Sequence, residues 1–392
     1  MSVSTRVTAY IVIVNWNGWR DTIECLESVL RLDHPNYRVV VCDNASADGS
    51  VERIIEWANG ALPATPDPDE RLAQLVDPPL PKPIAVRRLT RADAERGGDG
   101  DRNAEQVVVI DVGANLGFGG ACNVGIRYAT RDPRCEYMWL LNNDTVVEPD
   151  ALTALVHRLE ARPRAGQCGS RLLRYRDPAR IEALGGEHYV RWSGATRPLG
   201  AGHDSAERVD VRDIESRLSY VGGASLCVTR RFVERVGLIE ESYFLYFEEI
   251  DWARRGGSRF TLAYAHDSVV YHKHGQSTGG DGSPSRSLLA DFFVQRNRLR
   301  FTRRHFPLSL PIVWANQLMM LVGRLVTGRS DRAALILRAA LSPSTYLSST
   351  KFDPSEVLAR YSTLPAPPPN EARPRSSGPT SYSGRRRSRA SA

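Results

Sequence analysis

Short apolar runs that end abruptly at polar residues recur through the first 150 residues. Tyr10–Val14 leads into Asn-Trp-Asn-Gly, and residues 38–42 end at Asp43. Residues 107–110 and 137–141 repeat the pattern. The segments between them carry apolar side chains three or four residues apart, which is typical of amphipathic helices. The alternation predicts an α/β fold with a mixed, mostly parallel sheet flanked by helices.

Composition divides the chain into three parts, the first of which contains an insertion. Residues 60–103 are rich in proline and end in Gly-Gly-Asp-Gly, so we expect an irregular insertion there. Residues 1–280 then form one domain around the sheet, and residues 281–350 form a helical C-terminal extension. Residues 351–392 are rich in Pro, Ser and Arg, a composition typical of disorder.

The basic charge is concentrated in the tail, which argues against a nucleic-acid-binding domain. The chain of 392 residues has a net charge of +7, and the tail from Pro365 carries six arginines against one glutamate. The rest is nearly balanced, so no nucleic-acid partner is expected. The six cysteines form no Cys-x-x-Cys pair and the first residues lack a secretory signal pattern, so we expect a cytoplasmic protein.

The segment Leu308–Val326 is apolar but contains Pro311, Asn316, Gln317 and Arg324. These residues are too polar for a clear membrane span. Two interpretations remain open. One is an interfacial helix with peripheral contact to the inner face of the membrane, and the other is a core helix followed by a solvated tail.

Polar side chains stand where the predicted strands end, at Asn15, Asp43 and Asn142–Asp144. In open α/β sheets, ligands bind beyond the carboxyl ends of strands. A carboxylate there suits a divalent cation that bridges phosphates. The alternative is that these are ordinary turn and helix-capping residues.

Three further patterns are candidates for chemistry. The glycine-rich segment 113–120 departs from the dinucleotide-binding pattern, yet lets backbone N–H groups approach a phosphate. The segment 244–251 surrounds three acids with aromatics, which raises carboxyl pKa values as a general base requires. His272 and His274 after a strand suit a metal or phosphate site. Each has a structural alternative: a turn, a solvated helix face, and a strand-end histidine.

Taken in order, these motifs resemble glycosyltransferase family 2, the inverting enzymes with a GT-A fold, and most closely its bacterial rhamnosyltransferase-like branch. The resemblance covers about residues 7–305, interrupted by the insertion. The segments that carry it are residues 13–18, 41–50, 115–125, 141–145, 237–251, 272–277 and 296–297.

The resemblance implies a role for each matching residue. Glu249 would be the catalytic base, and Asp144 with His272 would hold Mg²⁺ or Mn²⁺. Contacts to the nucleotide and to the diphosphate-sugar pocket would come from Asn15, Asp43, Asn115, Gly117, Asn123 and Asn143. Support on the acceptor side would come from Glu248, Asp251 and Trp252.

The implied reaction transfers a sugar from a dTDP- or UDP-sugar, with dTDP-rhamnose as the first choice, to a saccharide or lipid-linked saccharide acceptor in cell-surface polysaccharide synthesis. Two alternatives remain. A processive synthase of the same fold would carry Gln-x-x-Arg-Trp, but residues 295–298 are followed by Leu299. A non-catalytic nucleotide-binding scaffold would bind donor without transferring it.

Overall fold

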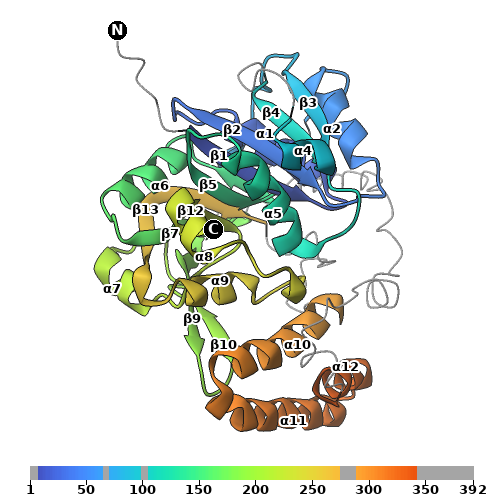
Figure 1. The fold of residues 1–392 in the computed structure, drawn as a ribbon, viewed down its shortest axis with the longest axis vertical. Helices are drawn as coiled ribbons and strands as arrows, with labels where there is room; N and C mark the ends of the chain where they lie inside the picture. Colours follow the sequence, from blue (N-terminus) through green and yellow to red (C-terminus); the bar gives the residue numbers. More distant parts are fainter. Residues whose placement is uncertain (1–7, 65–69, 99–104, 274–287, 342–392) are drawn as a thin grey trace, which may run out of the picture.

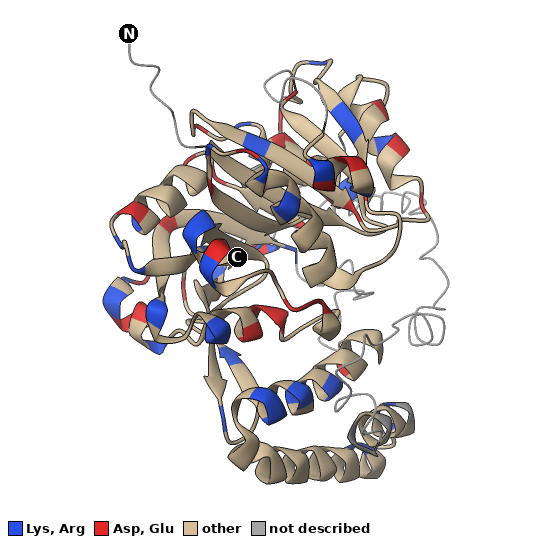
Figure 2. Cartoon of the chain, in the orientation of Figure 1, with Lys and Arg blue, Asp and Glu red and all other residues tan. Residues whose placement is uncertain are grey.

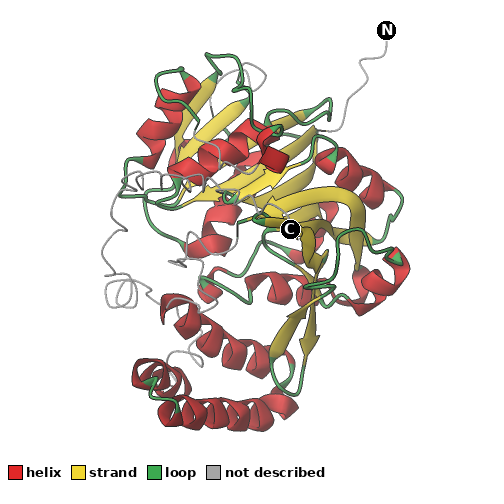
Figure 3. Ribbon diagram, turned by 180° about the vertical axis from the view of Figure 1, so that it is seen from behind, coloured by secondary structure: helices red, strands yellow, loops and turns green. Residues whose placement is uncertain are grey.

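A long twisted sheet runs through the computed structural model, which describes residues 8–64, 70–98, 105–273 and 288–341. Helices cover both faces of the sheet, and the C-terminal helices of residues 288–341 lie beyond it (Figure 1; Figure 3). The strands of this sheet are β1 (Thr8–Asn15), β2 (Tyr37–Asp43), β3 (Val86–Thr90), β4 (Val107–Asp111), β5 (Cys135–Asn142), β6 (Thr145–Val147), β7 (Ala165–Arg174), β8 (Asp177–Leu184), β12 (Ser225–Thr229) and β13 (Thr261–His272).

The order along the sheet is β3-β4-β2-β1-β5-β12-β7-β13-β6, with β8 paired to β7. The first five strands of this order are parallel, whereas β12 runs antiparallel between β5 and β7. A second, three-stranded antiparallel sheet consists of β9 (Gly186–Val190), β10 (Ala195–Pro198) and β11 (Tyr220–Val221). The predicted fold class, a mixed and mostly parallel sheet flanked by helices, is confirmed.

Helices connect most of the strands. They are α1 (Trp19–Val29), α2 (Ser50–Ala58), α3 (Glu70–Ala73), α4 (Arg91–Arg96), α5 (Gly117–Thr130), α6 (Ala151–Glu160), α7 (Val211–Arg217), α8 (Arg230–Val236), α9 (Glu248–Gly256), α10 (Leu288–His305), α11 (Leu310–Val326) and α12 (Ser330–Leu341). Short 3₁₀ turns lie at Glu241–Tyr243, Gly257–Arg259 and Pro307–Ser309.

Side-chain alternation along the central strands builds one core layer on each face of the sheet. Ile11 and Ile13 of β1 point toward α1, α2 and α6, whereas Tyr10 and Val12 point toward α5 and α8. Both faces are therefore covered, which is why the strands read as continuous apolar runs. Burial of each such side chain contributes roughly 1.5–3 kcal/mol. All six cysteines lie in these described segments as buried thiols, in line with the interpretation of them as core residues.

The structure differs from the expectation of an irregular insertion at residues 60–103. Within it, β3 pairs in parallel with β4 and extends the main sheet by one strand, and α4 follows β3 directly. The sequence of β3, Val-Arg-Arg-Leu-Thr, is half exposed because an edge strand has only one neighbour. It therefore lacks the apolar run by which the central strands are recognised.

The predicted helical region is confirmed over residues 288–341, where α11 packs against α10 and α12. The predicted domain boundary at 280/281 and the tail at 351–392 lie outside the described residues. Among the described residues, one helix, Pro307–Val326, is long and apolar enough to cross a membrane by length and composition.

Candidate functional site

The sheet register brings the predicted polar residues to one edge. Asn15 of β1 pairs with Asp43 of β2, and Val14 pairs with Asn142 of β5. On the far side of β5, the backbone N–H of Asn142 donates to the carbonyl of Ala224, 3.1 Å away, just before β12. The carboxyl ends of the parallel strands and the start of β12 thus form a common rim.

Asn15 is the centre of a buried hydrogen-bond network at this rim. Its Nδ2 donates to Oδ1 of Asp43 at 2.7 Å and to Ser46 Oγ at 3.1 Å. Its Oδ1 accepts from Thr22 Oγ at 2.8 Å and from Asn143 Nδ2 at 3.4 Å. Asn15 is fully buried, so it fixes the loops after β1, β2 and β5 relative to one another.

The glycine-rich segment begins α5 against the same rim. Oδ1 of Asn115 accepts from Nδ2 of Asn44 at 2.8 Å and from the N–H of Gly117 at 3.0 Å. Gly117 has φ +72°, and a Cβ there would lie 2.1 Å from the carbonyl oxygen of Phe244. Only glycine fits this position, because both the left-handed conformation and the close backbone exclude a side chain.

Asn123 lies one to two turns further along α5 and is fully buried. Its Nδ2 donates to the carbonyl of Ile239 at 2.9 Å and to the Glu241 carboxylate at 3.0 Å. Its Oδ1 accepts from the N–H of Ile239 at 3.0 Å. The structure thus places Asn123 between α5 and the segment leading to α9, and its predicted contact with the donor stays a prediction.

Asp144 lies in the turn just before β6, and His272 ends the neighbouring strand β13, where it pairs with Thr145. Oδ1 of Asp144 lies 3.3 Å from Nε2 of His272, and the other ring nitrogen lies 2.8 Å from Oε1 of Glu182 on β8. Burial favours the neutral form of the carboxyl group, but the facing imidazole outweighs it, so the pKa of Asp144 is lowered. Burial likewise opposes the imidazolium, yet the two carboxylates hold the pKa of His272 well above 6.5.

This arrangement fits a divalent cation as far as the described residues allow. A metal-binding histidine usually donates its second ring nitrogen to a carboxylate, as His272 does to Glu182. No group of three His, Cys, Asp or Glu side chains in the described ranges has the spacing of a complete metal site. Asp144 and His272 would therefore hold Mg²⁺ or Mn²⁺ together with phosphate oxygens and water, the usual pattern for Mg²⁺. His274 lies outside the described residues.

Lys273 links the loop of Asp144 and the end of β13 to α1, a role that no local sequence pattern indicates. Its Nζ lies 2.7 Å from Oδ1 of Asp21 and 2.5 Å from Oε2 of Glu24. Its backbone N–H donates to the carbonyl of Asp144 at 2.9 Å. The hydroxyl of Tyr175 donates to the other oxygen of Glu24. The ion pair thus fixes the end of β13 beside the loop that carries Asp144.

Two neighbouring glutamates begin α9 close to the rim. A Cβ at Gly223 would lie 2.1 Å from Oε1 of Glu249, so the carboxylate occupies the space beside this glycine, just before β12. Burial and the nearby Glu187 raise the pKa of Glu249 from 4.5 to about 7. Glu248 is buried, its Oε2 has no hydrogen-bond partner among the described residues, and its pKa is raised well above 4.5 by burial and by Glu249.

Asp251 and Trp252 hold α9 in place. The carboxylate of Asp251 is fully buried and lies 2.8 Å from Nε of Arg255 and 2.7 Å from Nε2 of His305 on α10. The indole N–H of Trp252 donates to the carbonyl of Gly237 at 2.8 Å. Within the described contacts, these two predicted residues bond to the protein itself.

The segment before α9 is strained and is held by α10. Phe244, Tyr246 and Phe247 have φ of 67°, 66° and 75°, which costs side-chain-bearing residues roughly 1 kcal/mol or more each. Nδ2 of Asn297 on α10 donates to the carbonyls of Tyr243, Leu245 and Tyr246 at 2.8–2.9 Å. Asn297 therefore stabilises the backbone that delivers Glu248 and Glu249 to the rim.

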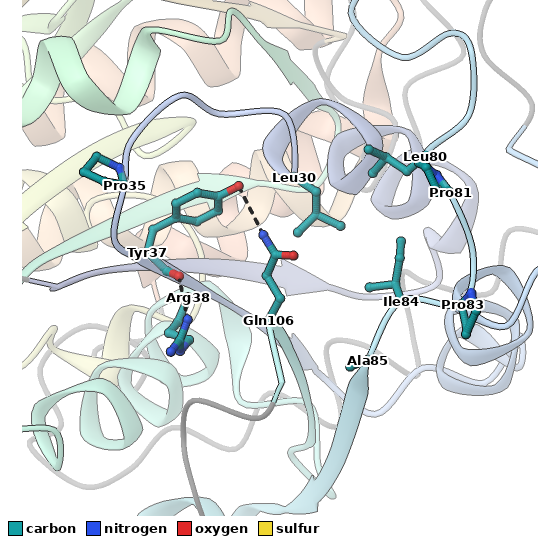
Figure 4. Close-up of a pocket in the computed structure, with 10 residues that line it drawn as sticks. All are labelled: Leu30, Pro35, Tyr37, Arg38, Leu80, Pro81, Pro83, Ile84, Ala85 and Gln106. Carbon is teal, nitrogen blue, oxygen red and sulfur yellow. Dashed lines mark hydrogen bonds between the residues drawn. The ribbon is translucent and has the colours of Figure 1, made fainter.

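A cavity of about 530 Å³ lies at the other end of the strands, beside the amino ends of β2 and β4 (Figure 4). Its lining includes Tyr37 and Arg38 at the start of β2 and Gln106 just before β4. Gln106 donates to the hydroxyl of Tyr37 at 3.4 Å. Because β2 separates this cavity from Asp43, it is not part of the candidate site.

An open sheet of this order, with amides and carboxylates at its carboxyl rim and a buried glutamate at the start of a neighbouring helix, has the architecture of the GT-A class. The family model described as glycosyl transferase family 2 matches residues 10–68 and 92–200. Over these residues, somewhat less than half of the chain, the protein is similar to glycosyltransferase family 2.

Two curated proteins illustrate the similarity. An N-acetylglucosaminyl-diphospho-decaprenol L-rhamnosyltransferase of Mycobacterium tuberculosis is 28% identical over 200 residues, which cover 47% of this chain and 64% of the relative. A low-salt glycan biosynthesis hexosyltransferase of Haloferax volcanii is 23% identical over 219 residues, covering 56% of this chain and 67% of the relative. The match thus spans somewhat less than two thirds of the mycobacterial protein.

Solved structures with a related chain path include a mannosyltransferase from Pyrobaculum calidifontis in complex with GDP-Man and Mn²⁺. It has a TM-score of 0.46 and 15% identity, and the match covers 86% of this chain and 87% of that one. GalNAc-T7 with UDP, GalNAc and Mn²⁺ has a TM-score of 0.48 and 14% identity over 76% of this chain and 48% of that one.

Proposed function

We propose that this protein is an inverting glycosyltransferase that moves a sugar from a nucleoside diphosphate donor to a saccharide or lipid-linked saccharide acceptor. The match to the family model supports transfer of a sugar, and the name of the mycobacterial relative supports rhamnose and a lipid-linked acceptor. We take dTDP-rhamnose as the first donor to test. The proposed place of action is the cytoplasmic side of the cell membrane.

The position and ionisation of Glu249 carry the proposal. Its carboxylate stands beside Gly223 at the sheet rim, and its pKa of about 7 is that of a base which is ionised yet still strong near neutral pH. In the proposed step, an acceptor hydroxyl oxygen bonds to the anomeric carbon while the bond to the diphosphate oxygen breaks. The hydroxyl proton passes to Glu249. A single displacement of this kind inverts the anomeric centre.

The rim residues bind and orient the donor in this proposal. Asn15 and Asp43 hold the loops that receive the nucleotide, and Asn115 with Gly117 shapes the start of α5 for the diphosphate. Asp144 and His272 would hold Mg²⁺ or Mn²⁺, which neutralises negative charge on a departing diphosphate. Glu182 orients the imidazole of His272 through the 2.8 Å contact.

Transfer by the purified full-length chain tests the proposal directly. A panel of dTDP- and UDP-sugars with Mn²⁺ is offered with a polyprenyl-diphosphate saccharide, and nucleotide release, product length and anomeric configuration are measured. One added sugar of inverted configuration supports the proposal. A long polymer from one acceptor would indicate a processive synthase, and donor binding with neither transfer nor hydrolysis would indicate a scaffold.

Glu249→Gln tests the assigned base, with Glu160→Gln as the matched control because Glu160 is exposed at the end of α6. Glu249→Gln should bind donor normally and lose transfer by about 10²-fold or more. The control should transfer at the wild-type rate. Near-normal turnover in Glu249→Gln would remove Glu249 from its role.

A further inference from the structure

The helix α11 is apolar on the side that faces solvent. Leu308, just before it, and Ile312, Met319, Val322 and Val326 recur at intervals of three, four or seven residues and therefore share one face. Their side chains are 89%, 46%, 66%, 58% and 82% exposed. An ordinary amphipathic helix of a globular protein turns this face toward the core.

The inward side of α11 buries Val313 against Leu299 of α10 and also makes polar contacts. Nε2 of Gln317 donates to the carbonyl of Gln295 on α10 at 2.7 Å, and the Arg324 guanidinium lies 2.8 Å from the carboxylate of Asp291. Polar contacts thus fix α11 to the rest of the protein. The orientation of the apolar face is therefore set by these contacts.

The turn between β9 and β10 extends the same surface. Trp192 is 45% exposed there, and its carbonyl accepts from Nδ2 of Asn316 on α11 at 3.4 Å. The Arg191 guanidinium lies 4.3 Å from the centre of the Trp192 ring. We call the stripe and this tryptophan together the α11 patch: Trp192, Leu308, Ile312, Met319, Val322 and Val326.

The charge around the α11 patch identifies what can cover it. From residue 292 to residue 330 the sequence contains no Asp or Glu but seven arginines. In Figure 2, α11 is free of charge along most of its length, whereas α10 beside it carries several basic positions. An apolar stripe on a stretch of sequence that carries arginines and no acid matches the acyl chains and anionic headgroups of a bilayer surface.

We propose that the α11 patch is a membrane-binding surface and that α11 lies in the plane of an anionic lipid bilayer. At about 1.5 Å per residue the helix is about 25 Å long, and tryptophan is enriched at the depth where acyl chains meet headgroups. Crossing the bilayer would break the Gln317 and Arg324 contacts and bury polar side chains in lipid. An in-plane helix keeps these contacts.

Other ways to cover the patch conflict with its charge. A second copy of this chain would bring the same arginine-rich segment against the first, and like charges disfavour such pairing. The chain beyond residue 341 carries basic residues too, including six arginines against one glutamate from Pro365 onward. An anionic lipid surface complements the charge and the apolar side chains at once.

Vesicle flotation of the full-length protein tests this independently of any transferase activity. The probes are phosphatidylcholine vesicles with and without phosphatidylglycerol. The test variant is Met319→Glu/Val322→Glu, and the control is Arg235→Glu at an exposed position of α8. Both change the net charge by −2, but only the first alters the α11 patch. Circular dichroism and light scattering check the fold and the oligomeric state of each protein.

The wild type and Arg235→Glu should float with the anionic vesicles, and the double variant should bind them about tenfold or more weaker. Binding should fall when phosphatidylglycerol is omitted. Failure of the wild type to float, or equal flotation of the double variant, would overturn the proposal. A wild-type dimer that ignores vesicles and is dissociated by Met319→Glu/Val322→Glu would overturn it as well, since the patch would then join two copies.

Discussion

Replacing Glu249 by glutamine should stabilise the folded protein at alkaline pH while it abolishes the proposed transfer. The pKa of Glu249 is raised from 4.5 to about 7, and each unit corresponds to about 1.4 kcal/mol. Ionising this carboxylate therefore costs the folded state up to about 3 kcal/mol. Because the side chain is partly exposed and water screens the charge, we expect about 2 kcal/mol.

The sign follows from where the proton binds more tightly. Below about pH 4.5 the carboxyl group is neutral in both states, so the variant and the wild type should differ least there. Between 4.5 and about 7 the unfolded chain ionises first, and the wild type loses stability as the pH rises through this window. Above it the wild type carries the full cost, which glutamine avoids.

Urea unfolding of the wild type, Glu249→Gln and Glu160→Gln, measured near pH 5 and near pH 9, checks this prediction. The free energy of unfolding of Glu249→Gln, relative to the wild type, should rise by about 2 kcal/mol between the two conditions, with an unchanged dependence on urea. Glu160→Gln should show no such rise. If the variant and the wild type differed in free energy of unfolding by the same amount at both pH values, the argument that burial disfavours the ionised carboxylate would be refuted.

Three other substitutions, one of them with a control, probe the supports of the site. Glu182→Gln should raise the Mn²⁺ concentration for half-maximal activity about 10–100-fold, because it removes the carboxylate that orients His272; an unchanged titration would contradict this. Gly117→Ala should lower the free energy of unfolding by about 3 kcal/mol or more, measured in urea, because its Cβ would meet a backbone carbonyl 2.1 Å away. Gly49→Ala, at φ +75° with open space around it, should cost only about 1 kcal/mol. Asn297→Ala should lower kcat more than it changes the KM for the donor, since it releases the backbone before Glu249; equal effects on both would point to general destabilisation.

The central strands could be predicted because each is buried on both faces and ends at a polar residue. This holds for β1, β2, β4 and β5, whose apolar runs are continuous. The edge strand β3 and the exposed start of β8 could not be recognised in this way. Half of their side chains meet water, so neither strand carries an apolar run.

The sequence indicates the candidate site residues but not the residues that contact them. The strand ends single out Asn15, Asp43 and Asp144, the aromatics single out the acids of residues 244–251, and the resemblance selects Glu249 among them. Their partners come from elements far away in the sequence, such as Glu182, 90 residues before the histidine that it contacts. No local pattern marks such a residue, because the contact exists only once the sheet order is known.

Because of Asn297, a functional fragment of this protein has to extend beyond the last strand of the sheet. The last strand of the sheet ends at His272, yet the amide that secures the approach to α9 comes from α10, 25 residues later. A fragment cut after β13 would keep every strand and lose the support beneath Glu249. Truncations made for crystallisation or genetic complementation should therefore retain α10.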